Sequence, residues 1–404
     1  MTTRRSALQA MGAMGAMGAM GIGAARWVRA GPLPAGTLDS QSLEALSGKK
    51  PLIKRSFRPP NYETPLASLG DPITANDRFF VRWHWANIPP VDPRTWRLNI
   101  AGDAAARSVE LSLADLRQTF ERVEVTAVCQ CAGNQRGLVE PHVPGVQWGC
   151  GAVGNAHWSG ARLKDVLARA GLRSEALEIA FDAGDSPVLE QGPDFTKSIP
   201  VWKALEPDTL IAYEMNGEAL PHWNGFPARL IVPGWAATYW VKQLTAISIR
   251  STPLASFWMS TAYRVPRGKY PLLSRFESQE SDTSVPVLDI DVNSVVTQPE
   301  DGSVAHLGVP LTVRGVAWDS GSGIRTVEVS SDGGQQWHPA TLGRDLGRYS
   351  FRAWHHTLTP RTRGPMPLMT RATSKAGLTQ PEVWTANPAG YHNNSIQAVG
   401  ITVG

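Results

Sequence analysis

The sequence predicts an α+β domain with mixed sheets, followed by an all-β sandwich of the immunoglobulin type. The chain has 404 residues, more than one hydrophobic core usually supports. Strand-like and helix-like segments mix from Arg78 to Ile249, whereas only strand-like segments follow Pro286. A serine-rich stretch, Ser278–Pro286, separates the two patterns. We therefore predict a first domain over residues 31–285 and a second over residues 286–404.

Residues 1–30 have the features of an export signal. Arg4 and Arg5 precede an apolar stretch rich in Gly, Ala and Met, which ends in small residues near Ala30. This order is typical of secretory signals, and adjacent arginines favour the twin-arginine route. Ala7 departs from that motif, which usually has a large apolar residue there. A membrane anchor is the alternative, but so much Gly and Ala makes a weak span. We expect cleavage and a periplasmic protein.

The net charge of +4 belongs to this signal. Four of the 39 basic residues and none of the 35 acidic ones lie in residues 1–30. The remaining chain is formally neutral, which removes the main support for nucleic-acid binding.

An exported chain enters an oxidising compartment, yet its cysteines do not form an obvious disulfide framework. There are three, so at least one is free or bound to a ligand. Cys129 and Cys131 are too close in sequence for an unstrained bridge. No Cys-x-x-Cys-His motif occurs, so we expect no covalently bound c-type haem in this chain.

In the first domain, residues 31–75 are rich in Pro and polar groups and indicate an extended lead-in. β-branched and apolar runs then predict strands at Val123–Val128, Leu177–Phe181, Thr209–Met215, Ala228–Val232 and Val241–Ile249. Helical spacing of apolar residues predicts helices at Leu111–Phe120, with Ser112 as N-cap, and Leu163–Ala170.

The second domain shows strands alone, at the spacing of an immunoglobulin-like sandwich. The predicted strands are Val287–Val296, Leu311–Trp318, Thr326–Ser331, Tyr349–His355, Leu368–Thr373 and Ile396–Val403. Asp332-Gly333-Gly334 indicates a hairpin turn. No cysteine lies in this domain, so it lacks the disulfide of antibody domains.

The segment Cys129-Gln130-Cys131-Ala132-Gly133-Asn134-Gln135-Arg136 follows the predicted strand Val123–Val128. A thiolate is a soft ligand for a redox metal, and a guanidinium nearby can hold an oxyanion. Free cysteines are more often small core residues, and we favour that interpretation for Cys129 and Cys150. For Cys131 the small-residue loop allows a bulky ligand to approach.

A second informative segment is Phe79-Phe80-Val81-Arg82-Trp83-His84-Trp85. If it is extended, Arg82 and His84 share one face, and Val81 and Trp83 share the other. An Arg and a His among aromatic rings could bind an anion in a partly dry pocket. A surface strand edge with solvated charge is the alternative.

Three further residues could contact an anion. Arg229 lies in an apolar strand, so it needs a buried anionic partner. Lys242 could supply a second cation to that partner, although a structural carboxylate would serve both. Tyr263 could donate to an oxyanion or simply pack.

Together these segments resemble the sulfite oxidase family of molybdenum enzymes, with the bacterial periplasmic sulfite dehydrogenases nearest. The resemblance spans about residues 60–404. Its motifs are Phe80–His84, Gln130–Asn134, Tyr213–Gly234, Tyr239–Lys242 and the closing Asn387–Asn394.

The resemblance implies a molybdenum–molybdopterin cofactor with Cys131 as the protein's thiolate ligand to the metal. The implied sulfite pocket contains Arg82, His84, Arg136 and Tyr263. The residues implied to hold the pterin and its phosphate are Phe80, Val81, Arg82, Trp83, His84, Cys131, Asp185, Asn224, Arg229, Trp240, Val241 and Lys242. Two departures from relatives are Gln135, where many have Arg, and Asn224, where vertebrate relatives have His.

The implied activity is oxidation of sulfite to sulfate by oxygen-atom transfer, with electrons passing to a cytochrome c or a haem c subunit. The second domain resembles the family's dimerisation domain, so a homodimer or heterodimer is expected. A sulfane-sulfur dehydrogenase of a thiosulfate-oxidising system is the alternative enzyme. A methionine-sulfoxide reductase of the same superfamily fits less well, since we would not expect it to carry the sandwich domain. A cofactor-less binding protein is the alternative outside enzymes.

Overall fold

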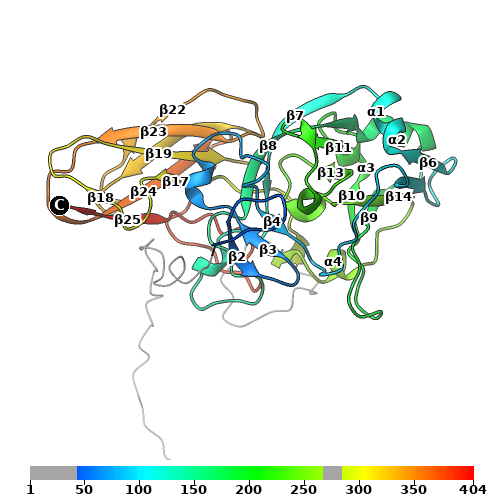
Figure 1. The fold of residues 1–404 in the computed structure, drawn as a ribbon, viewed down its shortest axis with the longest axis horizontal. Coiled ribbons are helices and arrows are strands. Elements are labelled where there is room, and N and C mark those ends of the chain that lie inside the picture. Colours follow the sequence, from blue (N-terminus) through cyan, green and yellow to red (C-terminus); the bar gives the residue numbers. More distant parts are fainter. Residues whose placement is uncertain (1–42, 267–283) are drawn as a thin grey trace, which may run out of the picture.

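The computed structural model describes residues 43–266 and 284–404. The predicted export signal and most of the stretch Ser278–Pro286 lie outside these residues. Figure 1 shows two lobes along the long axis, with the first domain in cyan and green at one end and the second in yellow to red at the other. The order predicted from the sequence, a mixed α+β domain and then a sandwich, is confirmed.

One mixed five-stranded sheet of the first domain has the order β10-β9-β14-β5-β6. Only β14 and β5 run parallel, whereas their neighbours are antiparallel. The strands are β5 (Arg97–Ala101), β6 (Val109–Ser112), β9 (Glu178–Ala183), β10 (Lys197–Pro200) and β14 (Leu244–Arg250).

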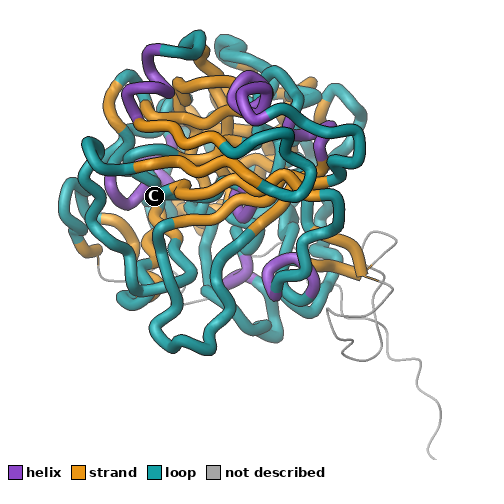
Figure 2. Tube along the Cα trace, turned by 90° about the vertical axis from the view of Figure 1, so that its right-hand side faces the viewer, coloured by secondary structure: helices purple, strands orange, loops and turns teal. Residues whose placement is uncertain are grey.

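A second, antiparallel sheet has the order β12-β11-β8-β7, and β13 also pairs with β11. Its strands are β7 (Val123–Gln130), β8 (Val153–Arg162), β11 (Leu210–Met215), β12 (Glu218–Ala219) and β13 (Arg229–Ile231). Figure 2 looks at the first domain end on, with strands crossing the middle and helices at the periphery.

The central strand β8 lies outside the strands predicted from the sequence. It contains Gly154 and Gly160, and glycine is depleted in strands because it packs no side chain. Both glycines allow close packing. A Cβ on Gly160 would lie 2.0 Å from the carbonyl oxygen of Ile211, and one on Gly154 would lie 2.5 Å from the Phe79 ring.

The lead-in predicted for residues 31–75 is instead partly a small sheet. Its order is β1-β2-β3-β4, with β1 (Leu43–Glu44), β2 (Leu52–Ser56), β3 (Asn61–Glu63) and β4 (Val81–Arg82). Buried side chains of this sheet, Leu52, Tyr62 and Val81, form a satellite core together with the neighbouring Trp83. Because burial fixes the pleat, Val81 and Trp83 face this core and Arg82 faces away, as the predicted alternation requires.

The helices are few and short. α2 (Leu163–Ala170) has the predicted bounds. α1 (Leu113–Gln118) starts two residues later than predicted, because Leu111 and Ser112 pair with β5. Ser112 is its N-cap and forms a capping box with Asp115. The other helical segments are α3 (Val201–Ala204), α4 (Phe257–Ser260) and the 3₁₀ turns η1 (Leu66–Leu69), η2 (Arg136–Leu138), η3 (His222–Asn224) and η4 (Ala237–Tyr239).

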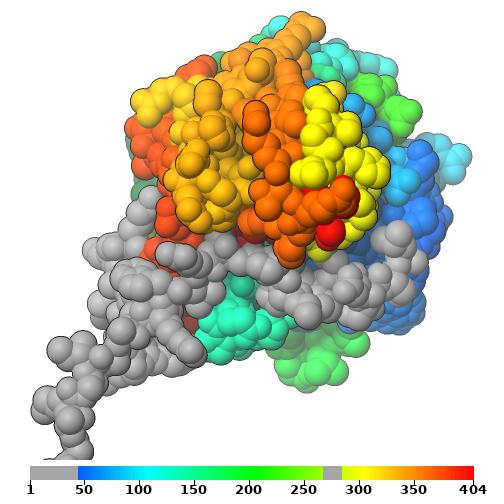
Figure 3. All heavy atoms as spheres, turned by 90° about the vertical axis from the view of Figure 1, so that its left-hand side faces the viewer, coloured from blue at the N-terminus to red at the C-terminus, as the bar shows by residue number. Residues whose placement is uncertain are grey.

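The second domain consists of two facing sheets, β17-β19-β23-β22 and β18-β25-β24-β20-β21, with an apolar core of its own. Figure 3 shows this domain covering one end of the molecule. Its strands are β17 (Asn293–Gln298), β18 (Val304–Ala305), β19 (Leu311–Trp318), β20 (Ile324–Ser330), β21 (His338–Pro339), β22 (Thr341–Leu342), β23 (Arg352–Leu358), β24 (Gly364–Ser374) and β25 (Ala398–Val403).

The predicted strand Val287–Val296 begins only at Asn293 in the structure. The preceding residues bond to the first domain instead: the Val287 amide donates to the Tyr263 carbonyl at 2.8 Å, and the Ile290 amide to the Gly234 carbonyl at 2.9 Å. Just before them, β15 (Arg264–Pro266) pairs with β16 (Ser284–Pro286).

Hydrogen bonds also join the two domains at the sheet that contains β7 and β8. The Val128 amide donates to the Tyr349 carbonyl at 2.9 Å. Asn155 Nδ2 donates to Ser350 Oγ at 2.9 Å. The main core of the first domain also includes buried side chains of the second, among them Trp318 and Phe351. The two domains therefore share a core where β7 ends.

The contacts of β8 predict that Gly160→Ala strongly destabilises the protein. The added methyl group would collide with the backbone of β11, and overpacking of this kind costs about 3 kcal/mol. The matched control is Gly184→Ala, whose Cβ would lie 3.6 Å from its nearest neighbour. Urea unfolding followed by tryptophan fluorescence measures both variants, and equal unfolding midpoints would contradict the close approach of β8 and β11.

Candidate active site

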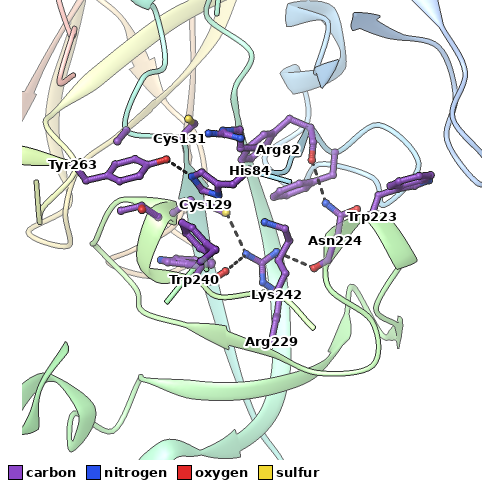
Figure 4. A pocket seen from close by; sticks show the side chains of 16 residues that line it. Arg82, His84, Cys129, Cys131, Trp223, Asn224, Arg229, Trp240, Lys242 and Tyr263 are labelled. Carbon is purple, nitrogen blue, oxygen red and sulfur yellow. Dashed lines mark hydrogen bonds between the residues drawn. The ribbon is translucent and has the colours of Figure 1, made fainter. Parts of the chain in front are cut away.

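A pocket lies where β7 ends, beside the segments of the first domain that carry Tyr263 and Trp240. Figure 4 shows the labelled side chains converging on it from several elements. The lining residues are Phe79, Phe80, Arg82, His84, Cys129, Cys131, Ala132, Phe195, Trp223, Asn224, Arg229, Ala237, Thr238, Trp240, Lys242 and Tyr263.

Cys131 stands directly after β7 and is only 6% exposed. Its amide donates to the Ala152 carbonyl at 2.9 Å, which extends the pairing with β8 by one residue. Its own carbonyl accepts from the Asn134 amide at 2.9 Å, so the chain turns at once. The backbone therefore places this thiol at the edge of the sheet, facing the pocket (Figure 4).

The loop after Cys131 is held by the second domain. The His392 amide donates to the Ala132 carbonyl at 3.2 Å, and Asn393 Nδ2 donates to the Gln135 carbonyl at 3.0 Å. Gln135 itself has φ 66°, a left-handed conformation that is uncommon outside glycine. We infer that the position of the thiol depends on both domains.

His84 and Tyr263 meet at the same end of the pocket as Cys131 (Figure 4). His84 Nε2 and Tyr263 Oη are 2.5 Å apart. Phe195 stacks on the His84 ring at 3.8 Å between centroids. Tyr263 has φ 58°, and a bulky residue in this region is a strained outlier of the kind that clusters at functional sites.

The charge states of this pair follow from their surroundings. Burial, together with the charges of Arg82, Lys242 and Lys197, holds the pKa of His84 well below its usual value. Burial raises the pKa of Tyr263. At neutral pH His84 is therefore an uncharged imidazole and Tyr263 keeps its proton, so the tyrosine O–H can donate to the imidazole nitrogen.

Arg82 is half-buried beside them. Its guanidinium donates to the neighbouring Trp83 carbonyl and to Asn61 Oδ1 at 3.3 Å. It forms no ion pair with any carboxylate of the described residues, so its charge remains available to an anion in the pocket.

The other end of the pocket is strongly cationic (Figure 4). Arg229 is 3% exposed and donates to the carbonyls of Asn224 at 2.9 Å and Trp240 at 3.0 Å, and more weakly to Cys129 Sγ at 3.9 Å. Lys242 lies 4.4 Å above the centre of the Trp83 ring and makes no hydrogen bond within the described part of the chain. Burial lowers the pKa of both groups, because it disfavours their charged forms.

This donor set fits a molybdopterin. Arg229 Nε is buried without a partner among the described residues. Half-buried Lys242 forms no ion pair among them, although the charges of Asp185 and Cys129 act on it. Unpaired buried cations are costly, so they imply an anionic ligand such as the phosphate of the pterin. A thiol at the opposite end suits a soft metal.

The structure brings together most of the predicted site residues. The following line the pocket: Phe80, Arg82, His84, Cys131, Asn224, Arg229, Trp240, Lys242 and Tyr263. Val81 and Trp83 belong to the satellite core behind it, and Val241 is a core residue whose carbonyl accepts from the Leu230 amide at 2.8 Å.

Arg136 and Asp185 are placed behind the wall of the pocket. The Arg136 guanidinium donates to the carbonyls of Ala389 at 2.7 Å and Val146 at 3.1 Å, and lies 5.1 Å from the centre of the Tyr391 ring. The turn η2 points this side chain into the contact between the domains. Asp185 is buried, and its pKa is raised by burial while the charge of Lys242 opposes the rise.

Several residues that line the pocket or lie directly behind its wall were missed from the sequence. Cys129, which we interpreted as a core residue, is buried yet contacts Arg229 within the pocket. Lys197 is 1% exposed and lies behind Tyr263, with Nζ 5.1 Å from the ring centre. A lysine within an apolar segment was the available signal for Lys197. Phe195, Trp223 and Thr238 carried no such signal.

Comparison with known proteins agrees with this site. The chain matches the family of oxidoreductase molybdopterin-binding domains over residues 85–258 and the family of Mo-co oxidoreductase dimerisation domains over residues 284–404. It is 39% identical to mitochondrial sulfite oxidase of Mus musculus over 296 residues, which cover 71% of this chain and 52% of that protein. It is 35% identical to sulfite oxidase of Gallus gallus over 341 residues, which cover 81% of this chain and 72% of the relative.

Among solved structures, the sulfane dehydrogenase SoxCD from Paracoccus pantotrophus is similar with a TM-score of 0.71 at 27% sequence identity. The similarity covers 85% of this chain and 84% of that one. Fold and site thus define an oxidoreductase molybdopterin-binding domain followed by a Mo-co oxidoreductase dimerisation domain. The chain belongs to the sulfite oxidase family of molybdopterin enzymes, as the sequence motifs predict.

The chain spans about half the length of the mammalian relatives it matches, namely 52%, 54% and 57% of the mouse, rat and human proteins. In residues 43–266 and 284–404, no helix has both the length and the apolar character to cross a membrane.

The buried lysines predict that the cofactor-free chain becomes more stable as the pH rises from 7 to 8.5. Burial lowers the pKa of Lys49 and of Lys197 to about 7, from an ordinary 10.5. In this pH range the unfolded chain binds more protons than the folded chain, so the free energy of unfolding rises with pH. We expect a gain of roughly 1 to 2 kcal/mol per lysine.

Urea unfolding of cofactor-free protein at the two pH values measures this gain. Lys197→Met should show a smaller gain than the unmodified chain, since one of the three lysines with a pKa of about 7 (Lys49, Lys197 and Lys242) is then absent. A free energy of unfolding that stays flat or falls over this range would contradict the assignment.

Proposed function

We propose that this chain oxidises sulfite to sulfate at a molybdenum centre bound through Cys131, and that the electrons pass to a cytochrome c. The observation that supports this most directly is the pocket itself, in which a buried thiol, half-buried Arg82 and the His84–Tyr263 pair lie together (Figure 4). The 35% identity to chicken sulfite oxidase over most of both chains supports the same substrate.

The cofactor would be held at both ends of the pocket. Cys131 would supply the thiolate ligand to the metal, and Arg229 and Lys242 would bind the phosphate of the pterin. Asn224 and the aromatic ring of Trp240 would line the space between them. When bound, a molybdopterin centre supplies oxygen-atom transfer and accepts two electrons.

The side chains of this protein then have separate tasks. Sulfite is a dianion, and Arg82 can neutralise part of its charge by charge-assisted hydrogen bonds. Tyr263 Oη can donate to a sulfite oxygen or to His84 Nε2. Phe195, stacked on His84, excludes water from this corner, which strengthens every charge interaction within it.

The overall reaction also needs a path for protons. Sulfite and water yield sulfate, two protons and two electrons. The uncharged imidazole of His84 can accept a proton at Nε2, directly or through Tyr263. The nearby cations that lower the pKa of His84 would then favour release of that proton to solvent.

A sulfane-sulfur dehydrogenase is the second candidate, because the structure of SoxCD is similar over 85% of this chain. The sequence identity of 27% is lower than the 35% to 39% found with sulfite oxidases. The two functions differ in substrate. Turnover of free sulfite by the purified chain would therefore support sulfite oxidation over sulfane-sulfur oxidation.

Location and assembly are part of the same proposal. The pair Arg4-Arg5 and the apolar stretch after it support export to the periplasm. The match to a dimerisation-domain family supports a homodimer, or a heterodimer with a haem-carrying subunit. Sulfite-dependent reduction of added cytochrome c, together with the molybdenum content of the purified protein, tests the function.

Cys131→Ser should fold but lose sulfite oxidation, because a serine hydroxyl is a much poorer ligand for a soft metal. Cys150→Ser is the matched control, since Cys150 is buried but does not line the pocket. Circular dichroism checks folding of both, and cytochrome c reduction checks activity. Full activity of the Cys131 variant would remove this residue as the metal ligand.

Arg82→Gln should lower kcat/KM for sulfite by roughly ten- to a hundredfold, since a hydrogen bond to a charged group is worth ~1.5–3 kcal/mol. Arg107→Gln serves as the control, because Arg107 is exposed and lies outside the pocket. Steady-state kinetics at fixed ionic strength measures both variants. If the two variants depend on sulfite concentration in the same way, Arg82 does not bind the substrate.

A further inference from the structure

The N-terminal segment of the described chain lies against the cationic end of the pocket. We call residues 44–50 the N-terminal strap. Leu46 packs on the satellite core beside Trp223. Trp223 Nε1 donates to the Ser47 carbonyl at 3.0 Å, and the Lys50 amide donates to the Asp77 carbonyl at 2.9 Å. The strap is therefore attached to two walls of the pocket, the one that carries Trp223 and the one that leads to Phe79.

Lys49 is the residue of the strap that points inward. It is 7% exposed. Its ammonium donates to the carbonyls of Asn76 at 2.5 Å and Phe79 at 3.1 Å, and to Asn224 Oδ1 at 2.5 Å. Three bonds use all three protons of the ammonium group. The neighbouring Lys50 is 59% exposed and instead pairs with Asp77 on the surface.

Asn224 connects Lys49 to the pocket. Because an ammonium group can only donate, it fixes the side-chain oxygen of Asn224 toward the strap and the amide nitrogen on the other side. That nitrogen donates to the Phe80 carbonyl at 3.1 Å, and the main-chain oxygen of Asn224 accepts from Arg229 at 2.9 Å. Figure 4 shows the hydrogen bond between Arg229 and Asn224.

We propose that Lys49 is a positioning residue of the cofactor pocket, which fixes Asn224 and thereby the groups on both sides of it. Through this one residue, whose side chain contacts the Phe79–Phe80 wall and whose main-chain oxygen contacts Arg229, the strap sets the separation between that wall and the guanidinium, where the phosphate end of the cofactor would bind. The inference rests on the proposed cofactor but not on its substrate. Mutation of a residue that hydrogen-bonds to a metal ligand from behind typically lowers metal affinity or activity by roughly ten- to a hundredfold. We expect an effect of similar size on the affinity for the cofactor.

The test compares four forms of the full chain produced in cells that make the cofactor: the unmodified protein, Lys49→Met, Asn224→Ala and the double variant. Molybdenum per chain and the fluorescence of the released, oxidised pterin measure cofactor content. The half-time of cofactor loss in dilute protein measures retention. Lys50→Met is the matched control, since it removes an adjacent lysine of the same strap that faces solvent.

We expect Lys49→Met to shorten the half-time of cofactor loss roughly tenfold, and Lys50→Met to leave it unchanged. The double variant should lose cofactor no faster than Asn224→Ala alone, because Lys49 acts through Asn224. Lys49→Arg, which keeps the charge and the donors, should recover part of the loss.

Two outcomes would overturn the inference: equal retention by Lys49→Met and Lys50→Met, or fully additive effects of the Lys49 and Asn224 variants. Thermal unfolding of the cofactor-free forms detects a variant that fails to fold. If Lys49→Met fails to fold, the half-times of cofactor loss of Lys49→Arg and Asn224→Ala still test whether Lys49 acts through Asn224. If the unmodified chain itself carries no molybdenum, the proposed function fails instead, so the two failures are distinguishable.

Discussion

Positive charge that forms no ion pair with a carboxylate of the described residues is the constraint on which the pocket depends. Arg229 is buried and Lys242 is half-buried at one end, and the charges of Asp185 and Cys129 act on Lys242 there. Aromatic faces offset part of the cost, since the Arg229 guanidinium lies 5.0 Å from the centre of the Trp158 ring and Lys242 lies over Trp83. An anionic ligand offsets the remainder, which makes the protein and its proposed cofactor parts of one electrostatic system.

The thiol end is constrained in a different way, by backbone hydrogen bonds that cross between domains. Cys131 continues the pairing of β7 with β8, and residues of the second domain then hold the loop that follows. Arg136 takes part in this contact through the Ala389 carbonyl. A residue that the sequence places five positions from the cysteine thus contributes to the support of the loop from behind.

Patterns over a few neighbouring residues were enough to predict several features of the fold and the site. The bounds of α2, the cap at Ser112 and the alternation around Arg82 all follow from periodicity over a few residues. The burial of Arg229 follows from its apolar neighbours. These features require no knowledge of how distant segments meet.

What the sequence could not predict depends on contacts between distant segments. β8 is a central strand although it contains glycines. Gly160 is suited to this strand because β11 packs too closely against it for a larger side chain. Lys49 and Asn224 are 175 residues apart in the chain, so nothing local marks either as the other's partner. The direction of the Arg136 side chain depends on a turn and on carbonyls of the other domain.

The shared core has a consequence for how such proteins can be recombined. Trp318 and Phe351 complete the interior of the first domain, and the Ala132 and Gln135 carbonyls find their donors in residues 392 and 393. A chimera that exchanged the sandwich for one from a distant homologue would leave these groups mismatched at the graft. Shuffling the two modules would succeed only if the closing segment of the donor were engineered to suit the recipient's cysteine loop.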